Sequence, residues 1–241
     1  MYRKNFIILL ISLHTAILFG QADNTGIVKY SPDFVFNEGL FLTFNQLKAN
    51  RPIPKTRILS KDDIDNFDFF TNLIENEMIY YYDNVGVRRE VITNNIWGFS
   101  RNGALFINYN GTFNRIPVVG SICHFVSNIT VMTERYDPYN DPFYYDRYSY
   151  GNYYNPSSFR SYPSRSAKNE MRQYLLNFSS GEIMVYDTKS VELLLIDDPE
   201  IYDEYQALRR RKKKQLKFYY LRKYNEKHPL YFPASKINRL Y

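Results

Sequence analysis

Two asparagine–glycine pairs in the middle of the chain constrain its fold more strongly than any other feature. Asn102-Gly103 and Asn110-Gly111 separate short runs of apolar and aromatic residues between positions 96 and 116. Asn and Gly both tolerate the positive φ angles of a type I′ turn, so such a pair between apolar runs is the strongest short-range signal for a β-hairpin. The pattern therefore predicts an antiparallel meander, which continues into an apolar strand at 121–127.

Two-residue turns at these pairs determine which residues of the meander face each other. The expected partners are Phe99 with Phe106, Trp97 with Asn108, and Asn108 with Phe113. Because side chains alternate between the two faces of a strand, each face receives its own set of residues. One face is expected to carry Trp97, Phe99, Phe106 and Phe113, and the other Ile96, Leu105, Ile107, Tyr109 and Ile116. Both sets are apolar, so we expect the meander to be covered on both sides or to leave an aromatic face for a ligand or partner.

The first 22 residues have the composition of a signal peptide. A basic start at 1–5 precedes an apolar run at 6–19, and Gly20 and Ala22 offer small residues for cleavage. The apolar run is too short to be a good membrane span, and no later segment is long and apolar enough to cross a bilayer. The sequence predicts an exported protein that is soluble or peripheral, located in the periplasm, at the outer-membrane periphery or outside the cell.

The residues that usually carry catalysis or bind metals are few and scattered. Cys123 is the one cysteine, so no internal disulfide is expected, and its apolar surroundings predict a buried side chain rather than a reactive thiol. After removal of the leader the histidines are His124 and His228, and no metal-binding, nucleophile or nucleotide motif accompanies them. We therefore predict no catalytic residue, no metal and no cofactor.

A tyrosine-rich segment interrupts the predicted strands. Residues 136–166 contain many tyrosines and several prolines but almost no aliphatic residues, so they cannot build a core. We expect a disordered insertion between strands, which is either a variable loop or a stacking surface for sugar rings or a protein partner. The tyrosines with which we associate binding are Tyr144, Tyr145, Tyr153 and Tyr154.

The last part of the chain is predicted to be helical after one more hairpin at 171–187. Asp198 followed by Pro199 is a typical helix start, because Asp caps the first N–H groups and Pro suits the first helical position. Six consecutive cations follow, namely Arg209, Arg210, Arg211, Lys212, Lys213 and Lys214. One solvated helix face cannot hold all six, so the helix must leave the core here or break into two pieces.

Together these segments predict one α+β domain with an antiparallel β-meander core, C-terminal helices and the disordered insertion. Its parts are expected at 23–135 and 167–241. The stretches at 38–44, 97–103, 120–125 and 220–233 resemble a group of uncharacterised exported proteins of Bacteroidota-type bacteria. The resemblance implies export from a Gram-negative cell and supplies no active site.

The leading functional hypothesis is an exported, non-enzymatic envelope or interaction protein. Its basic helix would dock on an anionic surface or on another envelope protein, because clustered Lys and Arg are attracted to anionic lipid. Nucleic acid is not expected as a partner, since the basic run lacks interleaved aromatic residues. The alternative is a carbohydrate-binding or carbohydrate-active domain that uses Trp97 and the tyrosines of the insertion.

Overall fold

The computed structural model describes residues 26–135 and 164–234, and it confirms a mixed α+β fold with antiparallel sheets. In chain order its elements are β1 (Ile27–Lys29), β2 (Gly39–Phe41), α2 (Phe44–Lys48), the short 3₁₀ helix η2 (Lys55–Arg57), β3 (Ile58–Leu59), α3 (Phe69–Ile74), β4 (Met78–Tyr82), β5 (Arg88–Ile92), η3 (Thr93–Asn95), β6 (Gly98–Arg101), β7 (Ala104–Tyr109), β8 (Thr112–Arg115), β9 (Ile122–Arg135), β10 (Ser164–Asn177), β11 (Ile183–Val185), α4 (Thr188–Leu195), α5 (Pro199–Gln206), α6 (Arg210–Lys227) and β12 (Tyr231–Pro233).

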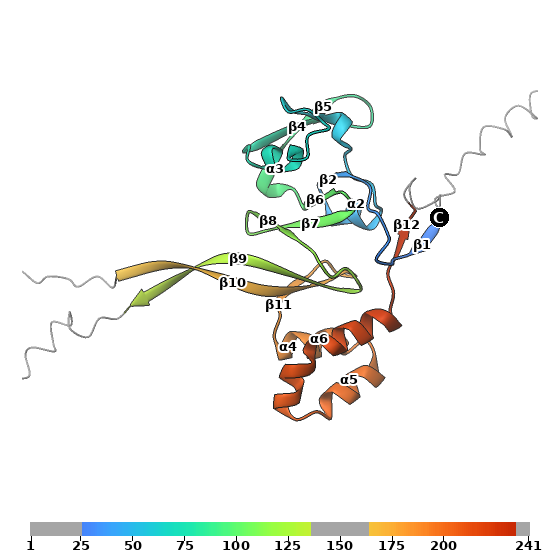
Figure 1. Ribbon diagram of the computed structural model, residues 1–241, viewed down its shortest axis with the longest axis vertical. Helices are drawn as coiled ribbons and strands as arrows, with labels where there is room; N and C mark the ends of the chain where they lie inside the picture. The colour runs from blue at the N-terminus through green and yellow to red at the C-terminus, as the bar shows by residue number, and fades with distance from the viewer. Residues whose placement is uncertain (1–25, 136–163, 235–241) are drawn as a thin grey trace, which may run out of the picture.

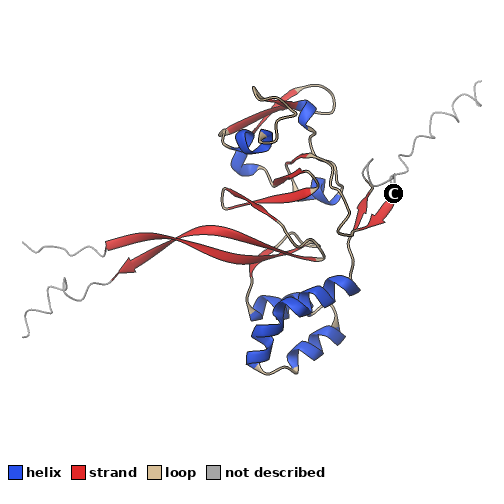
Figure 2. Cartoon of the chain, viewed as in Figure 1, coloured by secondary structure: helices blue, strands red, loops and turns tan. Residues whose placement is uncertain are grey.

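The elements form a stack of layers along the long axis of the molecule (Figure 1). The sheet β3-β4-β5 with α3 lies at one end, and the sheet β2-β6-β7-β8 follows it. Next comes the sheet β11-β10-β9, and α4, α5 and α6 lie at the opposite end. Figure 2 shows that the strands extend from the end with α3 through the middle of the molecule, and that the largest group of helices lies at the opposite end. These helices pack against β9 and β10 through Ile122 and Leu175.

The predicted meander is present with the predicted turns and register. Phe99 lies opposite Phe106, and Asn108 lies opposite Phe113. Asn102 and Asn110 have φ angles of 49° and 53°, and the glycine after each also has a positive φ. Few residues other than Asn and Gly adopt this left-handed conformation, which is why the two pairs located the turns correctly.

Both faces of the meander are covered, as expected, but the assignment of two residues to the faces was wrong. Leu105 and Ile107 enter the central core, and Phe99 packs against α3 on the opposite side. Trp97 lies with the central core and Ile96 with the α3 side, which reverses the prediction. Strict alternation does not reach these two residues, because β6 begins only at Gly98, after the 3₁₀ helix η3.

The strands β9 and β10 form a long ribbon that extends away from the layers (Figure 1). The predicted insertion at 136–166 was too long, because residues 164–166 pair with 133–135 in this ribbon. That prediction relied on the lack of aliphatic residues, whereas the backbone hydrogen bonds of a ladder do not depend on the side chains. Residues 136–163, with Tyr144, Tyr145, Tyr153 and Tyr154, lie outside the described residues.

The helix α5 begins where its capping residues predict. The Asp198 side chain accepts a hydrogen bond from the Ile201 N–H at 3.1 Å, and Pro199 is the first residue of α5. The helix then breaks at residues 207–209, and α6 begins at Arg210. This confirms the predicted alternative in which the helix breaks into two pieces at the basic run. Among the described residues, no helix combines the length and the apolar character needed to span a membrane.

Candidate functional site

The predicted basic run lies at the corner between α5 and α6. Arg209 is the N-cap residue of α6, and Arg210 to Lys214 form its first turns. We call the exposed members of the run the basic corner, namely Arg209, Arg210, Arg211, Lys212 and Lys214. The side chains of the basic corner make no hydrogen bond or ion pair with any described residue, so their charges face solvent without a partner there.

Lys213 differs from the rest of the run because its side chain is bonded to other residues of the protein. Its Nζ donates to Glu192 Oε1 at 2.7 Å and to Gln206 Oε1 at 2.6 Å, and its side chain is only 13% exposed. The Tyr205 hydroxyl donates to the Lys213 carbonyl at 3.0 Å. These contacts hold the start of α6 against α4 and α5. The structure therefore separates one structural cation of the run from the five of the basic corner.

Lys217, one turn further along α6, also faces inward. Its Nζ donates to the Tyr186 carbonyl at 3.0 Å and lies 3.8 Å from the centroid of the Tyr186 ring. Burial lowers the pKa of Lys217, since desolvation disfavours the charged form. Lys213 and Lys217 are four residues apart and share one helix face, so the remaining cations are left on the solvent-facing sides.

The helix itself adds positive potential to the basic corner. The first N–H groups of an α-helix lack intrahelical partners, and the aligned peptide dipoles place about half a positive charge at this end. The Arg209 side chain caps none of these groups. Cations at a helix N-terminus are unfavourable for the isolated helix. At the basic corner, cations that repel one another therefore lie beside N–H donors without helical partners. A bound anion would reduce this repulsion and could accept hydrogen bonds from the N–H groups.

The opposite end of the helical unit is electrostatically balanced. Asp198 is 3% exposed, and its carboxylate accepts from Lys227 Nζ at 3.0 Å and from His228 Nε2 at 2.7 Å. Lys227 also pairs with Glu200 at 2.7 Å. The hydrogen bonds from Lys227 and His228 hold the pKa of Asp198 well below its ordinary value. This cluster clamps the start of α5 to the end of α6, so the charges at that end serve the fold.

The structure does not bring Trp97 to the basic corner. Its side chain is half-buried and packs against Phe44, with ring centroids 5.5 Å apart. Trp97 thus contacts α2, in a different layer from the C-terminal helices (Figure 1). The four tyrosines of the insertion lie outside the described residues, so the carbohydrate alternative stays a prediction.

Cys123, His124 and His228, the cysteine and histidines of the described residues, are buried or hydrogen-bonded. Cys123 is fully buried, and burial raises the pKa of its thiol to about 12. His124 Nε2 is hydrogen-bonded to Gln173 Oε1 at 3.0 Å, on the ribbon of β9 and β10. Within residues 26–135 and 164–234, no three His, Cys, Asp or Glu residues gather closely enough to hold a metal ion.

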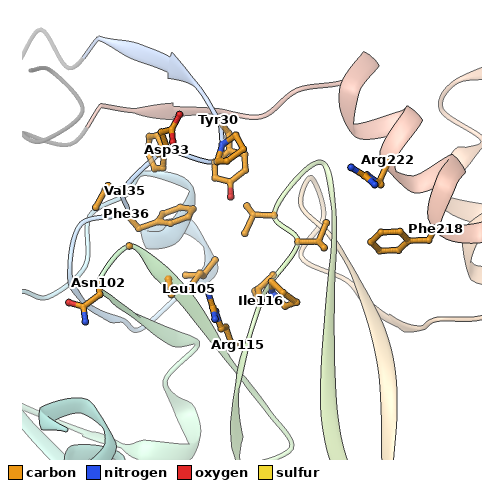
Figure 3. A pocket seen from close by; sticks show the side chains of 17 residues that line it. Tyr30, Asp33, Val35, Phe36, Asn102, Leu105, Arg115, Ile116, Phe218 and Arg222 are labelled. Atoms are coloured by element: carbon orange, nitrogen blue, oxygen red, sulfur yellow. The ribbon is translucent and has the colours of Figure 1, made fainter. Parts of the chain in front are cut away.

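A cavity that sequence reasoning missed lies between the N-terminal loop at 30–36, the end of β8 and α6 (Figure 3). Its volume is about 730 Å³, and Arg115 and Arg222 both line it. The lining residues come from segments far apart in the chain, so no local sequence pattern could predict the cavity.

Residues 39–228 match a family of unknown function, DUF6563. The chain belongs to this family. The matched range begins in β2 and ends just after α6, so it includes the basic corner and the Asp198 cluster. The strand pair β1–β12 and the loop at 30–36 lie outside it. No curated protein and no solved structure matches this DUF6563 member.

Proposed function

We propose that the protein is an exported, non-enzymatic envelope protein that docks through its basic corner on an anionic membrane surface. The observation that carries the proposal is the contrast between the two ends of α6. At its C-terminal end Lys227 is paired with Asp198 and Glu200. At its N-terminal end the five cations of the basic corner make no ion pair with any described residue. The unbalanced positive charge of the basic corner supports a negatively charged partner.

The number of cations suits reversible binding to lipid headgroups. A Lys or Arg near an anionic bilayer contributes about 1 kcal/mol, and the contribution falls off within a Debye length of about 10 Å at 0.1 M salt. Five such residues contribute on the order of 5 kcal/mol, which corresponds to weak, salt-dependent attachment. This strength fits a peripheral protein that is held at a surface without being inserted into it.

Export and the lack of an enzymatic role rest on separate observations. The basic start at 1–5 followed by the apolar run at 6–19 supports export, as does the resemblance to exported proteins of Bacteroidota-type bacteria. The burial of Cys123 and the hydrogen bond of His124 to Gln173 favour a binding role, because neither residue is arranged for nucleophilic or general-base catalysis.

Co-sedimentation with vesicles tests the docking proposal. We expect the protein to sediment with vesicles that contain phosphatidylglycerol and to remain in solution with pure phosphatidylcholine. A variant with the basic corner changed to Gln, retaining Lys213, is expected to lose most of the binding, at least tenfold in the lipid concentration required. Added salt above about 0.5 M should have the same effect on the wild type.

A matched variant controls for net charge. It changes five exposed cations of the β-rich part of the molecule to Gln, namely Lys29, Arg51, Lys61, Arg88 and Lys168. Both variants remove the same formal charge, so a specific role for the basic corner predicts that the control variant binds almost as well as the wild type. Equal loss in the two variants, or no loss in the basic-corner variant, would contradict the proposal.

A further inference from the structure

The strand β5 forms a free edge of the sheet β3-β4-β5. It pairs with β4 on one side, and no described residue bonds to its backbone on the other side. Four of its five residues are exposed, namely Arg88, Arg89, Glu90 and Ile92. Figure 1 shows this sheet at the end of the molecule opposite to the C-terminal helices. A free strand edge presents N–H and C=O groups that can pair with another strand.

The hydrogen bonds between β4 and β5 show which backbone groups are free. The Asp83 N–H donates to the Val87 carbonyl at 3.0 Å, at the start of the ladder. Hydrogen-bonded pairs alternate along an antiparallel ladder, so the odd-numbered residues of β5 bond to β4. The groups that face away from the sheet belong to the even-numbered residues, namely Arg88, Glu90 and Ile92.

The side chains beside these free groups carry opposite charges. Arg88 and Glu90 lie on one face of β5, and neither makes an ion pair with any described residue. The Arg88 guanidinium lies over the Tyr80 ring, 4.5 Å from its centroid. Arg89 lies on the other face and is paired with Asp83, whose Oδ2 is 3.0 Å from Nε. The free edge therefore presents a cation and an anion, two residues apart, without an ionic partner in the described chain.

We propose that β5 pairs with β5 of a second copy of this chain, so that two sheets join in a symmetric dimer. Two antiparallel copies of one strand are related by a twofold axis perpendicular to the sheet. An axis at Arg89 places Arg88 opposite Glu90 of the second copy, and the symmetry repeats this match on the other side of the axis. The free N–H and C=O groups of these residues then bond to each other across the interface.

Other registers of the two strands lack this match. An axis at Glu90 places two carboxylates opposite each other, and an axis at Arg88 does the same with two guanidinium groups. An axis at Val91 places Glu90 opposite Ile92. Opposite charges across a strand pair are stabilising, whereas like charges directly opposite each other are destabilising. The charge pattern therefore favours one register and disfavours its neighbours.

The other face of β5 is compatible with the same register. The two Arg89 side chains meet at the axis, where each is paired with Asp83 of its own chain. Val87, which is 48% exposed, lies opposite Val91 of the second copy, so apolar surface is covered on both sides of the axis. The interface lies far from the basic corner (Figure 1), and it does not depend on the proposed membrane docking.

Sedimentation equilibrium measures this association. We expect the wild type to be monomeric at about 1 μM, where vesicle binding is measured, and largely dimeric at about 500 μM, the range of weak association. Arg88→Glu and Glu90→Arg each place like charges in both cross-strand pairs and should raise the dissociation constant by at least about tenfold. Lys61→Glu makes the same change in net charge as Arg88→Glu at another exposed position, and it should dimerise like the wild type.

A mixture of the two edge variants tests the register directly. The Glu90→Arg chain has two cations at the edge and the Arg88→Glu chain has two anions, so each repels its own copies and attracts the other. An equimolar mixture should form a heterodimer at least as stable as the wild-type dimer. Association of the mixture would also show that both variants are folded. If one of them does not fold, the double variant Arg88→Glu/Glu90→Arg exchanges the charges and should dimerise like the wild type.

Amide hydrogen exchange tests whether the copies associate by strand pairing. The N–H groups of Arg88, Glu90 and Ile92 should exchange more slowly as the protein concentration is raised. Those of Arg89 and Val91, which already bond to β4, should change little. Three results would each overturn the proposal: a wild type that stays monomeric throughout the range, an equimolar mixture that does not associate, or a dimer whose edge amides stay unprotected.

Discussion

Phe99 and Phe106 stack across β6 and β7, with ring centroids 4.6 Å apart and an interplanar angle of 9°. Phe70 of α3 stacks on the other side of Phe99 at 5.1 Å. The aromatic face of the meander is therefore closed by the N-terminal part of the chain and not by the C-terminal helices. This stack is part of the buried cluster that joins the first two layers of the molecule.

Replacement of the central ring of this stack is expected to be strongly destabilising. Phe99 is 3% exposed, so Phe99→Ala leaves a cavity and should lower the free energy of unfolding by about 3–5 kcal/mol. Phe67→Ala is the matched control, because Phe67 is 66% exposed and its removal should change little. Urea unfolding followed by circular dichroism measures both; a small effect at Phe99 would show that the layers are held by other contacts.

Lys213 should behave unlike its neighbours in the basic run. Lys213→Gln removes hydrogen bonds to Glu192 and Gln206 and should cost roughly 1–2 kcal/mol of unfolding free energy. Lys212→Gln and Lys214→Gln should stay within about 0.5 kcal/mol of the wild type. The same unfolding experiment decides the point. Equal effects at all three positions would mean that the contacts of Lys213 contribute nothing to stability.

The Asp198 cluster predicts a loss of stability in acid. The folded state holds the pKa of Asp198 below its ordinary value of 3.8, so the carboxylate contributes stability above that pH and loses it as the pH falls. We expect Asp198→Asn to lower the melting temperature by several degrees at pH 7. The difference from the wild type should shrink steadily below about pH 4. Thermal unfolding between pH 3 and 8 measures it, and a constant difference would contradict the clamp.

Cys123 is expected to be inert in the folded protein. Burial raises the pKa of its thiol to about 12, and the Sγ atom donates to the Gly120 carbonyl at 3.2 Å. Modification by a thiol reagent such as 5,5′-dithiobis(2-nitrobenzoate) should therefore be negligible at pH 8 and fast in 6 M guanidinium chloride. Rapid modification without denaturant would show that β9 opens locally.

Sequence reasoning succeeded where a local residue pair determines the backbone. Asn102-Gly103 and Asn110-Gly111 located the turns because few other residues adopt their φ angles. Asp198 with Pro199 located the start of α5 for a similar local reason. The faces of Ile96 and Trp97 were assigned wrongly, since alternation was extended beyond the first residue of β6, where the chain leaves η3.

The non-local features could not be read from the chain in this way. The basic run was recognised as a group, but the separate role of Lys213 depends on Glu192 in another helix. Tyr30, Arg115 and Arg222 line the same cavity, and their positions in the chain give no sign of it. Such features depend on how the layers stack, which the pattern of each segment does not specify.

The pairing of β1 with β12 has a consequence for the order in which the molecule can assemble. Phe232 of β12 is fully buried against Phe34, Phe36 and Phe178. Because synthesis proceeds from the N-terminus, Phe232 is not available to cover the other three rings until almost the whole polypeptide has been made. A chain released shortly before Leu230 would expose them together with the unpaired edge of β1, and would be prone to aggregate.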